Sequence, residues 1–113
     1  MSLIDSFLEE LYEVTNKIFS AATVTYRVIR ASHLYFRVTI DENTFIDIYF
    51  NSDTGRKDFT LIHRENRIYG TDNLYGWHYH PFNAPTKHVP CQEPSAEDIP
   101  IEMRKIIEDI LKQ

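Results

Sequence analysis

The chain has 113 residues and a mass of 13.4 kDa, which fits a single domain spanning residues 1–113. With 42% hydrophobic and 26% charged residues it can bury a core, which excludes an intrinsically disordered chain. No apolar run reaches the roughly 18 residues of a membrane span, so we expect no membrane association. No signal-peptide pattern is visible, and the one cysteine, Cys91, cannot form an internal disulfide, so we expect a cytoplasmic protein.

The formal net charge of −5 is unevenly distributed. Residues 1–21 hold four acids and one base, and residues 93–113 hold six acids and three bases, so each end is net −3. Residues 22–92 are net +1, with eight bases and seven acids, and contain all five histidines. This distribution argues against a general nucleic-acid coat protein but leaves room for a local anion-binding surface in the middle of the chain.

The first predicted element is a helix, because apolar residues recur at three- and four-residue steps from Leu3 to Phe19. Ser2, with Asp5 three residues later, resembles a capping box. A second helix is predicted near the C-terminus, where the same periodicity runs from Ile99 to Leu111.

Between the helices the apolar period changes to two, which is typical of strands with one buried face. Polar turns at 41–44, 51–55 and 65–66 divide this region, and four prolines make residues 81–94 an expected irregular connection. We expect strands at residues 24–29, 34–40, 45–50, 58–64, 67–70 and roughly 75–80.

These elements predict an α+β fold. Short strands joined by tight turns favour an antiparallel meander of about five or six strands. The N- and C-terminal helices should pack on one face of that sheet, which leaves the other face free.

The free face carries the first candidate site. Arg27 and Arg37 should share it with Tyr35, Asp47 and Tyr49, because residues two apart point the same way. Arginines among aromatic rings suit phosphate contact and base stacking. The alternative is a solvated sheet face stabilised by cross-strand arginine–aspartate pairs.

The second candidate is a group of histidines. His78 and His80 alternate with Trp77 and Tyr79, so both imidazoles should leave the same strand face, and His88 follows in the next segment. With one imidazole as general base and another as general acid, such a group suits RNA cleavage without a metal. We therefore expect a catalytic set of Asp72, His78, His80 and His88, with Arg27, Arg37 and Lys87 as phosphate contacts.

The same segment permits two other interpretations. His78, His80, His88 and Cys91 supply three nitrogens and one sulfur, a ligand set that suits tetrahedral zinc, although their spacing matches no zinc-finger motif. The histidines could instead make structural hydrogen bonds in an aromatic-rich closing strand.

Three short motifs occur within residues 67–91: Asp72-Asn73, His78-x-His80-Pro81 and Lys87-His88-Val89. Together they resemble the signature of the TumE-like toxin family. This chain differs from that signature in placing residues 74–77 between the first and second motifs. The resemblance implies a small, β-rich toxin of a toxin–antitoxin pair, often partnered by a helix-turn-helix antitoxin.

Together, the residues and the resemblance predict a toxin that acts on RNA as a ribonuclease and requires no cofactor. The alternative function is that of a non-catalytic binding or interaction protein. In that case the sheet face or the histidine loop would hold a ligand, a partner or a metal ion.

Overall fold

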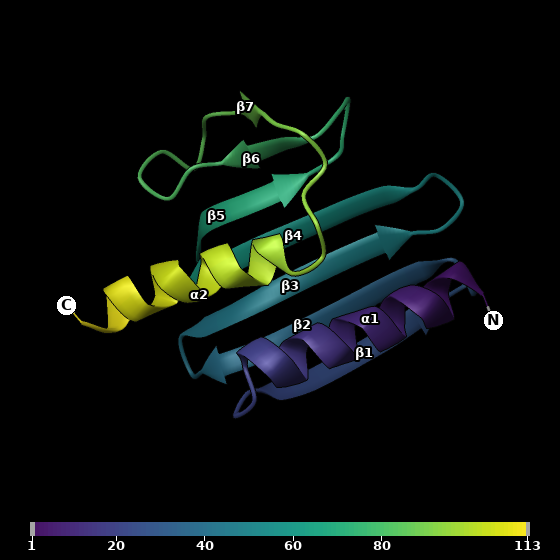
Figure 1. The fold of residues 1–113 in the computed structure, drawn as a ribbon, viewed down its shortest axis with the longest axis horizontal. Helices are drawn as coiled ribbons and strands as arrows, with labels where there is room; N and C mark the ends of the chain where they lie inside the picture. The colour runs from purple at the N-terminus through teal and green to yellow at the C-terminus, as the bar shows by residue number, and fades with distance from the viewer. Residues whose placement is uncertain (1, 113) are drawn as a thin grey trace.

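The computed structural model describes residues 2–112, which form two helices and one antiparallel sheet (Figure 1). The sheet has seven strands, paired in chain order from β1 to β7. No helix within the described residues is long and apolar enough to cross a membrane. In chain order the elements are α1 (Leu3–Ile18), β1 (Thr23–Ile29), β2 (His33–Asp41), β3 (Thr44–Asn51), β4 (Arg56–His63), β5 (Asn66–Asp72), β6 (His78–His80), β7 (Val89–Pro90) and α2 (Asp98–Leu111).

The α+β meander expected from the sequence is confirmed, with one strand more than predicted. The prediction was wrong at the last strands. Residues 75–77 do not extend β6, because Tyr75 and Gly76 have φ angles of 58° and 102° and form a turn. The additional strand β7 lies in the proline-rich stretch that was expected to be irregular. Strand β7 forms through its short pairing with β6, a tertiary contact that no local sequence pattern predicts.

Both helices pack on the same face of the sheet (Figure 1). Helix α1 begins with the predicted capping box, in which the Ser2 side chain accepts from the Asp5 backbone N–H. The Phe7 ring of α1 packs edge-on against Phe50, with ring centroids 4.9 Å apart. Met103 of α2 is fully buried in the same core. The helices therefore cover the apolar side chains of the central strands and leave the opposite sheet face open.

The open face carries a row of directly paired residues that crosses six strands. As predicted, Arg27, Tyr35 and Tyr49 lie on this face. Each member of the row is the cross-strand partner of the next, so their side chains stand on the same side of the sheet. The row consists of Arg27, Tyr35, Tyr49, Asp58, Asp72 and His78.

The core of the central strands generates a stability prediction. Leu61 of β4 has 0% exposure, so Leu61→Ala should lower the free energy of unfolding by about 2–5 kcal/mol through lost burial and a residual cavity. Urea unfolding followed by circular dichroism measures this change. Ile101→Ala on the exposed side of α2 is the control and should cost less than about 1 kcal/mol. Equal losses in the two variants would contradict this description of the core.

Candidate functional site

Asp72, His78, His80 and His88 meet at the edge of the sheet formed by its last three strands. Asp72 ends β5, His78 and His80 are the first and last residues of β6, and His88 directly precedes β7. The antiparallel register pairs Asp72 with His78, and the same register continues from β6 into β7. All four residues that the sequence predicted as catalytic are therefore brought together, on the open face of the sheet.

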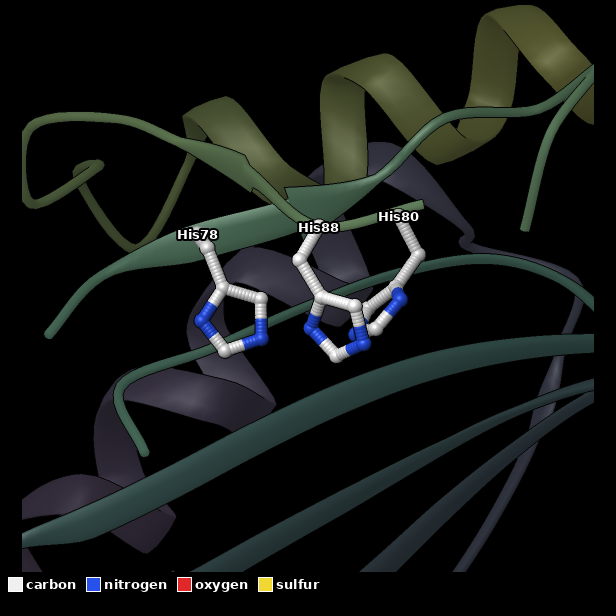
Figure 2. Close-up of side chains that lie close together, drawn as sticks. All are labelled: His78, His80 and His88. Atoms are coloured by element: carbon white, nitrogen blue, oxygen red, sulfur yellow. The ribbon is translucent and has the colours of Figure 1, made fainter. Parts of the chain in front are cut away.

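The four side chains are within interaction distance of one another. Oδ2 of Asp72 lies 3.3 Å from Nε2 of His78 and 3.5 Å from Nε2 of His80. The His80 and His88 ring centroids are 4.5 Å apart, and that of His78 lies 4.9 Å from His88 and 5.1 Å from His80. Figure 2 shows the three rings side by side and projecting in the same direction. The carboxylate thus faces two imidazoles, and the third ring lies against both.

Backbone carbonyls set the orientation of two rings. Nδ1 of His78 is 3.2 Å from the carbonyl oxygen of Gly76, and Nδ1 of His80 is 3.1 Å from that of Pro85. Because a carbonyl only accepts hydrogen bonds, each Nδ1 carries the proton and donates. Gly70 is the cross-strand partner of His80, and a Cβ there would crowd the Phe59 carbonyl oxygen at 3.1 Å while making only ordinary contact with the His80 ring. The Nε2 atoms consequently face Asp72.

His80 is the buried member of the group, with 3% exposure. Burial lowers the pKa of His80 below its ordinary value of 6.5, and the positive charge of Arg67 and the neighbouring His88 lower it further. Asp72 opposes this shift through its hydrogen bond and its negative charge. Burial dominates, so near neutral pH His80 is uncharged. With the proton on Nδ1, Nε2 is unprotonated, so its contact with Asp72 is a hydrogen bond only in the charged form of His80.

The group lines an open pocket of about 550 Å³ that also contains two arginines. Arg67 donates from Nη2 to the Pro85 carbonyl that also accepts from His80. Arg56 contacts Asp58 at 3.3 Å, and its Nε is buried without a hydrogen-bond partner in the described part of the chain. Neither arginine was predicted from the sequence to lie at this site. In the sequence, these two arginines are marked only by their positions in the strands that precede the histidines. The strand register brings them into the pocket, and local sequence patterns do not encode that register.

The three predicted phosphate contacts lie outside this pocket. Arg27 and Arg37 line a separate pocket on β1–β4, and Arg37 makes two hydrogen bonds to Asp47, at 2.7 and 2.9 Å. Four strand spacings separate β2 from β6, about 19 Å along the sheet. Lys87 is exposed beside His88 and does not line the histidine pocket. The predicted cross-strand arginine–aspartate pair is present, and Asp58 lines both pockets.

The histidines could hold a metal ion, but without Cys91. His78, His80 and His88 each offer a ligand nitrogen, and the three ligand atoms lie within 4.8 Å of one another. Cys91 lines a different pocket together with Tyr69 and Tyr79. Tyr79 alternates with the histidines along β6, so this pocket lies on the other side of the sheet. The structure thus separates the predicted sulfur ligand from the three predicted nitrogen ligands.

The lowered pKa of His80 predicts a pH dependence of stability. The unfolded chain, in which this histidine has its ordinary pKa, binds a proton at higher pH than the folded protein does. The free energy of unfolding should therefore fall as the pH drops below about 6.5. In His80→Gln, urea unfolding at pH 7.5 and pH 5.5 should show a smaller difference than in the wild type. An unchanged difference would mean that His80 is not held neutral in the fold.

Comparison with known proteins assigns neither a family nor a function to this site. No family model matches the chain, and neither the curated proteins nor the solved structures contain a significant match to it. What the site can do therefore has to be argued from its own residues.

Proposed function

We propose that the protein cleaves RNA at the histidine pocket and acts as the toxin of a toxin–antitoxin pair. The observation that carries the proposal is the convergence of Asp72, His78, His80 and His88 in one open pocket that also contains Arg56 and Arg67. A carboxylate, several imidazoles and two guanidinium groups form a set suited to acid–base chemistry on a phosphodiester. The three segments that resemble the TumE-like family supply Asp72 and all three histidines.

In the proposed reaction one imidazole removes the proton from a ribose 2′-hydroxyl. The 2′-oxygen then attacks the adjacent phosphorus, the bond to the 5′-oxygen breaks, and a second imidazole protonates that leaving oxygen. The products are a 2′,3′-cyclic phosphate and a free 5′-hydroxyl. The requirement for a 2′-hydroxyl would restrict the activity to RNA.

Exposure and contacts distinguish the roles of the histidines. His78 faces the Gly76 carbonyl with Nδ1 and Asp72 with Nε2, and an imidazolium, which donates from both nitrogens, would make both contacts. We assign His78 as the general acid and His88, the exposed ring, as the general base. His80 is a positioning residue, because it is buried and uncharged and its ring lies against both of the others.

The arginines of the pocket would bind the phosphate. Arg56 and Arg67 line the same pocket as the histidines, so their guanidinium groups could donate to a phosphate oxygen there. Stabilising negative charge on the phosphorane is worth most when the donors are already in place. We therefore assign the phosphate-binding role that was predicted for Arg37 and Lys87 to Arg56 and Arg67, which lie closer to the histidines.

The proposed partner is a helix-turn-helix antitoxin, and the proposed compartment is the cytoplasm. Both rest on the family resemblance and on the sequence composition. A toxin of this kind must be held inactive in the cell that makes it, so its antitoxin would cover the pocket or compete with RNA for the open face.

A second candidate function is metal binding by the three imidazoles, favoured by their ligand nitrogens lying within 4.8 Å of one another. Neutral imidazole is a common ligand for zinc and similar ions, and Nδ1–H bonds to carbonyls orient such rings. Asp72 offers an oxygen beside two of them. This candidate and the first differ in what a chelator does to activity and stability.

The catalytic assignment predicts that His78→Ala and His88→Ala each lower RNA cleavage by about 10²–10⁴-fold, because each removes one proton-transfer group. Cleavage of a labelled single-stranded RNA measures the rate. His33→Ala is the matched control, since His33 lies in β2 and hydrogen-bonds Ser32, and it should retain the wild-type rate.

Two further measurements with the same cleavage assay distinguish RNA cleavage from metal binding. The wild-type rate should fall on both sides of a pH optimum and should survive EDTA. Loss of activity or of thermal stability in EDTA, restored by zinc, would favour the metal centre instead. Wild-type cleavage by the His78→Ala, His88→Ala double variant would exclude a catalytic role for either ring.

The open face generates a prediction about binding. The Arg27 guanidinium lies 4.9 Å above the Tyr35 ring, and Arg27 pairs with no carboxylate in the described structure. If RNA crosses this face, Arg27→Ala should weaken RNA binding and reduce the slope of affinity against salt by about one ion. Fluorescence anisotropy at several salt concentrations measures both. Arg30→Ala, in the turn after β1, is the control; an unchanged slope in Arg27→Ala would place the RNA path elsewhere.

A further inference from the structure

Tyr75 is the most exposed large side chain beside the histidine pocket. It has 100% exposure, although aromatic side chains usually bury most of their surface. It lines the pocket together with Leu74, which is also exposed, and with His78. The ring therefore contributes nothing to the hydrophobic core, and its position at the pocket calls for another explanation.

The backbone at Tyr75 is in a conformation that side chains disfavour. Its φ angle is 58°, in the left-handed region where glycine, asparagine and aspartate predominate. Residues 73–76 form a turn closed by the Gly76 N–H donating to the Asn73 carbonyl at 3.3 Å. Position i+2 of such a turn would accommodate glycine without strain, and here it carries a tyrosine. Strain at a pocket is an observation that points towards function.

Other residues with positive φ have a simpler explanation. Arg64 and Glu65, like Arg30 and Ala31, lie in the short connections of β-hairpins. The connection of Arg64 and Glu65 has two residues, and such hairpin turns require positive φ at both to match the twist of the strands, whereas Arg30 and Ala31 lie in a three-residue connection. Tyr75 lies instead in the longer connection between β5 and β6, beside Gly76, which already supplies a flexible position.

The turn that carries Tyr75 is held in place at both ends. The Asn73 side chain accepts from the Lys57 N–H at 2.8 Å and donates to the Gly55 carbonyl at 2.9 Å. Its far end, Gly76, has its carbonyl oxygen 3.2 Å from Nδ1 of His78. The tyrosine is thus displayed from a segment that is anchored to the β3–β4 turn and bonded to a proposed catalytic residue.

We propose that Tyr75 is a substrate-binding residue on which an unpaired base of single-stranded RNA stacks, next to the phosphate that enters the histidine pocket. An exposed aromatic ring accepts any base, because every base presents a π-face. The neighbouring Arg56 and Arg67 would bind the backbone while the ring holds the base. This inference rests on the proposed RNA-cleaving function for its substrate class.

The test compares Tyr75→Phe, which keeps the ring, with Tyr75→Asn, which tolerates positive φ and removes it. Binding is measured with a 2′-O-methyl RNA 12-mer, which lacks the attacking hydroxyl and cannot be cleaved. Tyr75→Asn should bind about 5- to 150-fold more weakly, the range for losing one base–aromatic stack, whereas Tyr75→Phe should bind like the wild type. Ala31→Asn, a charge-neutral change at positive φ in the remote β1–β2 connection, should leave binding unchanged.

A base-free sugar–phosphate oligomer of the same length isolates the stack. The wild type should prefer the base-containing oligomer, and Tyr75→Asn should lose that preference while keeping its affinity for the base-free backbone. The melting temperature of Tyr75→Asn should equal or exceed that of the wild type, because the strained side chain is removed. A lower melting temperature would instead assign Tyr75 a role in holding the fold.

These experiments distinguish a failure of the stacking role of Tyr75 from a failure of the proposed RNA cleavage. If the wild type cleaves RNA and Tyr75→Asn keeps wild-type affinity and KM, the stacking role is overturned and the ring would be free for a protein contact. If the wild type binds the 12-mer through Tyr75 but cleaves no RNA, the stacking role stands and the catalytic proposal fails. If the wild type neither binds nor cleaves RNA, both are overturned.

Discussion

The pairing of β5 with β6 is the constraint on which the site depends. It sets Asp72 directly opposite His78 and Gly70 opposite His80. Because side chains alternate between the faces of a strand, a slip of one residue would turn both histidines towards the helices and away from Asp72. The hydroxyl of Thr71, which is buried and donates to the His78 carbonyl at 2.8 Å, reinforces this register from the opposite face of the sheet. The short strand β6 is thus given a defined position by polar contacts.

The one-sided packing of the sheet explains how a small, acidic protein can gather two arginines and three histidines in one open pocket. The two helices belong to the net negative end segments of the chain, and both lie against the apolar face of the sheet. His78, His80 and His88 are left on the other face, where Arg56 and Arg67 line the same pocket. The overall charge of −5 therefore says little about the field at the pocket, which depends on charges within about one Debye length.

Asp72 and the segment that follows it link the proposed chemistry to substrate binding. The Asp72 carboxylate contacts the two histidines with Oδ2 and accepts from the Leu74 N–H with Oδ1 at 3.0 Å. One side chain thus fixes the start of the turn that displays Tyr75 and also orients the rings.

The sequence by itself determined the two helices, the meander and the side of the sheet on which Arg27 and Arg37 lie. These are local properties, since periods of 3.6 and 2 and turn residues specify them within short windows. It also placed His78 and His80 on one strand face, because they are two residues apart, whereas Asp72 and His88 join them through the pairing of β5, β6 and β7. Only the tertiary structure decided that β7 pairs with β6, that Arg56 and Arg67 enter the pocket, and that Cys91 and Arg37 do not. Those outcomes depend on long-range strand register and on positive φ angles at residues 75 and 76, which no local periodicity encodes.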